Sequence, residues 1–197
     1  MRNNVTTAIT VSLMLLDLTA NGQNADEPMD SRIKRLLQAE EFKEERIELI
    51  SIGSAALPAL VQLFDSSSDA TELGRIMRVA TAINGNHKPF LLKMQVLAKG
   101  VIGYNQVAQM VAIQSLGVIG SSDQAPLLEE LILDRNQSLT AHFNAVRALG
   151  KIGNERSLAA LAKALANAEK DTHLRSEIET TVKAIRVRHG VRPPKQE

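Results

Sequence analysis

Apolar residues recur along this chain at the three- and four-residue spacing of amphipathic α-helices, with polar residues between them. The stripe is clearest in the last helical segment, where one face carries five positions: Leu174, Ile178, Thr181, Val182 and Ile185. The preceding segment repeats the stripe with small residues, among them Ala145 and Ala148, which allow neighbouring helices to approach closely. The pattern predicts an all-α chain.

A recurring motif ends these apolar segments. Isoleucine is followed by glycine, or by asparagine and glycine, at Ile52-Gly53, Ile83-Asn84-Gly85, Ile119-Gly120 and Ile152-Gly153. These isoleucines recur at nearly even intervals, and one further interval of the same length reaches Ile185. Glycine is typical of the residue that leaves a helix in the left-handed conformation, so each motif predicts a helix end with that geometry. The regular recurrence itself is typical of a repeat protein.

Each repeat also has a recognisable start. Pro58, Pro89 and Pro126 lie shortly after the motif glycines. Proline is tolerated in the first turn of a helix, where its missing N–H has no partner to lose, so each proline predicts a new helix. Polar runs at 65–69 and 134–138 then separate two apolar segments in each unit. Each unit is therefore predicted to be a helical hairpin.

The predicted second helices carry capping residues. Asp69 is expected to be an N-cap with Glu72 as its capping-box partner, and Asp171 is expected to be a second N-cap. A hairpin that is apolar on two sides cannot bury both of them alone, so neighbouring hairpins must stack. The sequence thus predicts an α-solenoid of about four to five hairpins.

Two segments of the chain resemble the repeats of a known family. The segments 145–153 (AVRALGKIG) and 171–185 (DTHLRSEIETTVKAI) resemble the HEAT repeat, in its short bacterial form that also occurs in phycobilisome-lyase-like proteins. The resemblance covers residues 31–189 and implies a right-handed solenoid whose second helices line a concave side. Segment 41–53 departs from the pattern because Glu48 stands where a small residue is expected, which suggests an atypical capping repeat.

Composition narrows the function classes. The 197 residues include 44% hydrophobic residues, enough for a core, but only 3% aromatic residues, which argues against a base-stacking surface. The formal net charge of +1 gives no overall field that would attract nucleic acid or an anionic membrane. The absence of cysteine excludes disulfides, thiolate zinc sites and cysteine nucleophiles.

The N-terminal segment is typical of a secretory signal. Arg2 precedes the short uncharged run Val5–Leu16, and the small residues before the expected cleavage point end at Gly22. We expect residues 1–22 to be a signal peptide, 23–30 a short linker, 31–189 the repeat array and 190–197 a basic, proline-containing tail. Cleavage after Ala25, retention as an anchor and a buried first helix stay open. Export to the periplasm or beyond follows, with no integral membrane segment after cleavage.

Signals for chemistry are missing from the sequence. The four histidines, His87, His142, His173 and His189, have no partner at metal-binding helical spacing. Every glycine pair is interpreted as a helix stop rather than a phosphate loop, and no serine stands in a nucleophile turn. The acidic run at 40–48 is expected to be a solvated face. We therefore expect no catalytic residue, metal or cofactor.

The leading functional hypothesis is an exported interaction scaffold that holds a protein or peptide in its concave groove. Two alternatives come from other classes: a tetrapyrrole (bilin) lyase-like enzyme, as the resemblance implies, and a solenoid that binds nucleic acid. Polar residues beside the buried stripes are expected to face the groove in the orientation that the family implies: Arg75, Arg78, Gln109, Gln114, His142, Arg147 and Arg175.

Overall fold

The computed structural model describes residues 27–83, 88–100, 106–168 and 171–191. These residues form ten α-helices and two short 3-10 helices and contain no strand. The predicted signal peptide lies outside the described residues, as does the tail beyond residue 191. The α-helices are α1 Met29–Gln38, α2 Phe42–Ile52, α3 Leu57–Ser66, α4 Ala70–Ala82, α5 Lys88–Ala98, α6 Gln106–Ile119, α7 Ala125–Leu133, α8 Leu139–Ile152, α9 Ser157–Asn167 and α10 Thr172–His189.

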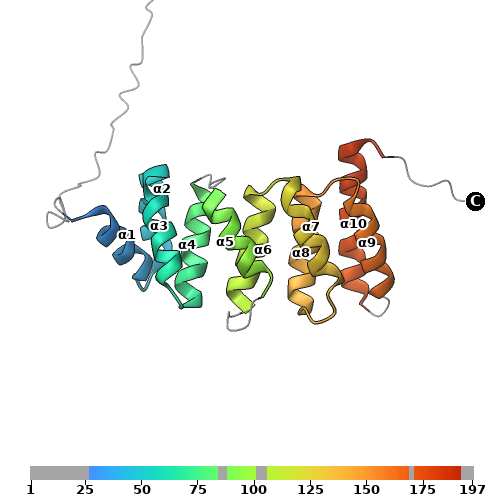
Figure 1. Cartoon of the computed structure of the whole chain (residues 1–197), viewed down its shortest axis with the longest axis horizontal. Coiled ribbons are helices and arrows are strands. Elements are labelled where there is room, and N and C mark those ends of the chain that lie inside the picture. Colours follow the sequence, from blue (N-terminus) through green and yellow to red (C-terminus); the bar gives the residue numbers. More distant parts are fainter. Residues whose placement is uncertain (1–26, 84–87, 101–105, 169–170, 192–197) are drawn as a thin grey trace, which may run out of the picture.

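Consecutive helices pair into hairpins that follow one another in a row (Figure 1). The hairpins are α1/α2, α3/α4, α5/α6, α7/α8 and α9/α10, stacked in the order of the sequence. This arrangement confirms the all-α solenoid that the repeat predicts. Helix α1 begins at Met29, so the end of the segment expected as linker already belongs to the first hairpin.

The second helices of the hairpins pack on one another in an unbroken line. From α4 onward each of them contacts its successor closely, in the order α4, α6, α8 and α10. Among the first helices only some neighbours meet in this way, for example α7 and α9, while α5 contacts mainly its own partner α6. Closer spacing along the second helices is the packing expected of a solenoid whose second helices lie on its inner side.

The core is the stack of apolar stripes that the sequence predicts. In α10, Leu174, Ile178, Thr181 and Ile185 are buried, whereas Val182 is only half-buried. The threonine in this stripe therefore lies deeper than the valine beside it. Its Oγ1 lies 3.4 Å from the carbonyl oxygen of Val146 in α8 and so has a polar partner inside the core.

The predicted helix starts are largely confirmed. Pro58 and Pro126 lie in the first turns of α3 and α7, and Pro89 is the second residue of α5. Asp171 caps α10, because its Oδ1 accepts the N–H of Leu174 at 2.9 Å. Asp69 caps α4 in the same way through the N–H of Thr71, also at 2.9 Å.

The capping box expected between Asp69 and Glu72 does not form, although Asp69 is the N-cap. The Glu72 carboxylate accepts a hydrogen bond from the Ser67 hydroxyl and does not reach back to the backbone of Asp69. The Ser67 Oγ also accepts the N–H of Asp69, at 3.2 Å. Since the serine already satisfies the backbone donor that the glutamate was expected to bind, the glutamate binds the serine instead.

The motif glycines do end helices, but two of them not with the predicted backbone. Gly53 has the expected positive φ of 69°. Gly153, at φ −64°, does not, and Gly120 is also outside the positive-φ region, so the left-handed geometry predicted there is wrong. Glycine is required at these two positions because there is no room for a side chain. An added Cβ would lie 2.3 Å from the Leu116 oxygen at Gly120 and 2.5 Å from the Leu149 oxygen at Gly153. Gly85 lies outside the described residues.

The first glycine of each pair has a different role from the second. Gly117 and Gly150 lie inside α6 and α8, so the interpretation of both members as helix stops is corrected. A Cβ at Gly117 would lie 2.8 Å from the Cα of Ala148. The two helices touch backbone to backbone at this point, which confirms the close approach predicted from the small residues in α8.

Glu48 of the atypical first unit has a local partner. Its Oε1 accepts a hydrogen bond from Nε of Arg32 in α1 at 2.9 Å. Both side chains are about two-fifths exposed, 41% for Arg32 and 39% for Glu48. A charged pair at the open end of the array agrees with the capping role expected for this hairpin, because an end repeat has one face in water.

One apolar stretch has the length of a membrane span. An 18-residue window within residues 42–66 has a mean hydropathy of 1.7, so the stretch passes a test of length and composition. In the structure the stretch contains two separate helices, because the chain turns at Gly53 with φ 69° and ψ −148°. Leu49 and Leu60, one from each helix, are completely buried in the core of the array. The stretch is accounted for here as the α2–α3 corner of the solenoid.

Candidate functional site

The seven polar residues expected to face the groove fall into two groups. Arg78, Gln114 and Arg147 are exposed on second helices. The other four reach carbonyl oxygens at or near the ends of first helices, so they hold the hairpins together. This second group is Arg75, Gln109, His142 and Arg175.

Three of these bonding residues stand at one repeat position. Gln109, His142 and Arg175 follow one another at equal intervals, in α6, α8 and α10. Gln109 Nε2 donates to Ala98 O at 3.0 Å, and Arg175 Nη1 donates to Leu165 O at 3.2 Å. His142 Nε2 lies 2.9 Å from Asp134 O.

Each of these contacts joins the second helix to the end of the first helix in the same hairpin. The final carbonyls of a helix lack partners within it, so a side chain that reaches them replaces water. Gln109 is only 7% exposed, which corrects its assignment to the groove. The equal spacing of the three residues was the sequence signal that could have identified this shared structural role.

Arg75 of α4 also binds carbonyl oxygens at the end of a first helix, but in the neighbouring hairpin. Its Nη1 donates to Leu37 O and to Ala39 O, both at 2.7 Å, at the end of α1. Its guanidinium also lies 4.8 Å from the centre of the Phe42 ring. These contacts commit the side chain to the joint between the first two hairpins, and its assignment to the groove is corrected as well.

A groove does run across the second helices. It lies between α6, α8 and α10 and has a volume of about 520 Å³. Of the seven expected residues, Gln114 and Arg147 line it. The remaining lining residues are Val118, Asn144, Ala148, Gly150, Lys151, Glu177, Thr180, Thr181 and Ala184.

Two polar pairs cross this groove in the same way. Gln114 Nε2 of α6 donates to Asn144 Oδ1 of α8 at 2.9 Å. Arg147 of α8 reaches Glu177 of α10 with both arms of its guanidinium, Nε to Oε1 at 3.1 Å and Nη2 to Oε2 at 3.2 Å. Each pair joins successive second helices across the same separation in sequence. We refer to Gln114, Asn144, Arg147 and Glu177 as the polar ladder.

The charged pair of the ladder, Arg147 and Glu177, is open to solvent on the arginine side. The hydrogen bond from Arg147 to Glu177, together with the charge of Glu177, raises the pKa of Arg147 above its ordinary value. The Arg147 side chain is nevertheless 62% exposed. An exposed ion pair of this kind contributes at most about 1 kcal/mol to stability, so Arg147 can form other contacts at little cost.

The family model for HEAT repeats matches residues 95–181, a range that contains the whole polar ladder. Residues 95–181 of this chain therefore carry HEAT repeats. A search of curated proteins gave no match. The expectation of a relation to the phycobilisome-lyase-like branch of the family stays a prediction.

Arg78 lies apart from the groove. It is exposed on α4 and does not belong to the residues that line the cavity. Arg188, near the end of α10, has partners in the neighbouring hairpin. Arg188 of α10 donates to Lys151 O at 2.8 Å and to Gly153 O at 3.2 Å, where α8 ends. Arg188 therefore joins the last hairpin to the one before it.

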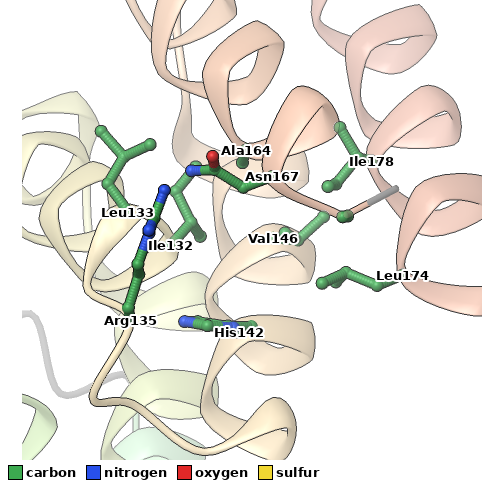
Figure 2. Close-up of a pocket in the computed structure, with 10 residues that line it drawn as sticks. Ile132, Leu133, Arg135, His142, Val146, Ala164, Asn167, Leu174 and Ile178 are labelled. Carbon is green, nitrogen blue, oxygen red and sulfur yellow. The ribbon is translucent and has the colours of Figure 1, made fainter. Parts of the chain in front are cut away.

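A second pocket lies between the last two HEAT hairpins (Figure 2). It has a volume of about 380 Å³ and shares no lining residue with the groove. His142 belongs to this pocket and not to the groove. Among the residues that the structure describes, no group of three or more His, Asp or Glu side chains could hold a metal ion.

Proposed function

We propose that this protein is a non-catalytic scaffold that binds a protein or peptide partner in the groove between α6, α8 and α10. HEAT repeats form helical scaffolds that usually mediate protein interactions, and the matched range covers most of this groove. The main observation behind the proposal is the polar ladder, a row of side chains on three successive second helices, of which Gln114 and Arg147 are exposed.

The composition of the groove suits a protein partner. Val118 is 58% exposed at one side, and Ala148 and Gly150 give the floor little side-chain bulk. Protein interfaces combine an apolar centre with a polar rim that forms hydrogen bonds. Small floor residues let the partner come close to the helices, while the ladder supplies donors and acceptors.

The charges of the groove favour an acidic segment of the partner. Arg147 is bound to Glu177, but Lys151 is exposed and forms no ion pair with any described residue. A partner carboxylate near Lys151 would also lie close to the guanidinium of Arg147. Such complementarity raises association rates and weakens with added salt.

The test uses site-specific photo-crosslinking in cells. A photo-reactive residue in place of Val118 should crosslink to a discrete partner, and the same residue in place of the exposed Ala159 of α9 should not. The double variant Arg147→Glu, Lys151→Glu should then abolish the Val118 crosslink, whereas Arg156→Glu should preserve it. Identical crosslinks from both positions, or no effect of the double variant, would refute the groove as the binding face.

The proposal includes export of the scaffold. The support is the order of Arg2, the apolar run Val5–Leu16 and the small residues up to Gly22. Leu15→Arg places a charge in the apolar run and should retain the protein in the cytoplasm with its N-terminus intact, whereas Leu15→Ile should be exported and shortened. Cell fractionation and the mass of the N-terminal peptide measure both. An unshortened chain that stays in the cytoplasm without any substitution would contradict export.

A further inference from the structure

The pocket between the last two hairpins has a small residue where the preceding hairpin has a large one. Ala164 of α9 lines it and stands one repeat after Leu131 of α7, which is buried in the core. The repeat therefore has a leucine at this place in the fourth hairpin and an alanine in the fifth. The volume that a leucine would occupy is left open and forms part of the cavity.

The walls of the pocket are apolar over most of their extent. Val146, Leu174 and Ile178 lie on one side, and Ile132 and Leu133 on the other (Figure 2). Ligand pockets in proteins are concavities of roughly 300–1,000 Å³ with mostly apolar walls and a few placed polar groups. At about 380 Å³ this pocket is at the small end of that range.

The polar groups gather at one end. Figure 2 shows the side chains of Arg135 and Asn167 pointing toward one another, with His142 at the lower edge. Arg135 is exposed and forms no hydrogen bond or ion pair with any described residue. Among the described lining residues, Arg135 is the one that is permanently charged. The mouth of the pocket therefore favours an anion.

We infer that this pocket is a binding site for a small unbranched aliphatic carboxylate. The apolar walls would take the hydrocarbon chain, and Arg135 would bind the carboxylate with two parallel N–H donors, helped by the Asn167 amide. A chain of about eight carbons has roughly ten non-hydrogen atoms, which fill most of the cavity if each takes about the 30 Å³ of a liquid water molecule.

The site is independent of the partner groove. The two cavities share no lining residue, and the groove is lined by α6, α8 and α10 alone. Failure of one proposal therefore leaves the other standing. Loss of carboxylate binding would not alter crosslinking from the Val118 position.

The experiment titrates the whole chain with octanoate by isothermal calorimetry. We expect saturable binding of one octanoate, with 1-octanol at least about tenfold weaker because it cannot form the charged hydrogen bonds. Arg135→Gln should weaken octanoate by about tenfold or more and leave 1-octanol unchanged. Arg156→Gln, which removes an exposed arginine outside the pocket, should bind octanoate as the unaltered chain does.

A second variant tests the cavity itself. Ala164→Leu restores the residue found one repeat earlier, so it should fill the pocket and abolish binding of both compounds while the thermal midpoint stays the same or rises. Should this variant unfold, Arg135→Gln and the amide shifts of Val146 and Ile178 on octanoate addition decide alone. No saturable octanoate binding, or equal binding by Arg135→Gln, overturns the proposal.

Discussion

Polar side chains on the second helices have two different roles, and the burial of each side chain distinguishes the two roles. Arg75 and Arg78 show this on a single helix, less than one turn apart. Arg75 is half-buried and holds two carbonyl oxygens of the first hairpin, whereas Arg78 is exposed. A donor that satisfies otherwise unpaired carbonyls at a helix end stabilises the fold, and a solvated arginine contributes little.

Arg75→Ala should therefore lower the free energy of unfolding by about 1.5–3 kcal/mol, the usual contribution of a hydrogen bond to a charged group. Arg78→Ala, the matched control, should change it by less than about 0.5 kcal/mol. Urea denaturation followed by circular dichroism measures both values. Equal effects of the two substitutions would show that the joint between the first two hairpins does not depend on Arg75.

Two glycines at the same repeat position differ in the space around them. Gly117 and Gly150 stand one repeat apart, inside α6 and α8. A Cβ at Gly117 would lie 2.8 Å from the Cα of Ala148, but at Gly150 the nearest atom is Thr181 Oγ1 at 3.4 Å, an ordinary contact.

Gly117→Ala should destabilise the protein by about 1–3 kcal/mol, since it forces two helix backbones apart. Gly150→Ala should instead stabilise it, by up to about 1 kcal/mol, because alanine reduces the entropy of the unfolded chain and the folded structure has room for it. Thermal and urea unfolding give the sign of each change. The same sign in both variants would contradict the helix contact described at Gly117.

The sequence predicted only some of the groove residues correctly. Arg147 and Gln114 were found because they flank a buried stripe, and the structure places them in one groove. Gln109 and Arg175 also flank the stripe, but toward the end of the neighbouring helix. Periodicity gives the face of a helix on which a residue lies, and not the distance from that face to the last carbonyl of another helix.

At the scale of elements, the Asp134 carboxylate binds two residues of the loop between α7 and α8. Asp134 Oδ1 accepts the N–H of Asn136 at 2.9 Å, and Oδ2 accepts Nε2 of Gln137 at 3.1 Å. The hydrogen bond from the backbone of Asn136 first, and that from Gln137 second, lower the pKa of Asp134 below its ordinary value. A carboxylate with a lowered pKa stabilises the folded state wherever it is ionised.

The stabilisation by Asp134 should consequently be complete above about pH 4, the ordinary pKa of an aspartate, and should disappear as the pH falls through the lower pKa of the folded state. Asp134→Asn should lower the thermal midpoint at pH 7, and the difference from the unaltered chain should shrink toward pH 2. Glu179→Gln, on the exposed side of α10, serves as the control for loss of one negative charge. A difference that stays constant with pH would contradict the role of the ionised carboxylate.

The elements themselves were the most predictable level of this structure. Proline in the first turn and isoleucine before a glycine are local signals, and they located the starts of α3, α5 and α7 and the ends of α2, α6 and α8. The backbone geometry at Gly120 and Gly153 was not predictable in the same way. There the glycine is needed because a Cβ would strike a carbonyl oxygen of the preceding turn, which also favours glycine without any positive φ.

At the scale of the whole molecule, stability is shared between neighbours. Each hairpin contacts the hairpins before and after it, and the second helices carry most of these contacts from α4 to α10. An end hairpin has one neighbour where an inner hairpin has two. In such an array, stability is close to a sum of repeat and interface contributions, so a local defect is not transmitted through the whole chain.

Hydrogen exchange on paired cavity variants tests this directly. Ile33 of α1 and Ile178 of α10 are both completely buried, and truncation of such a side chain costs about 2–5 kcal/mol. Ile33→Ala should accelerate amide exchange in α1, α2 and α3 and leave α9 and α10 unchanged, while Ile178→Ala should do the reverse. The central helix α6 should be among the slowest to exchange in both variants, because it has second helices on both sides. A uniform acceleration along the chain would instead mean that the protein unfolds as one cooperative globule, and the hairpins would then not act as separable repeats.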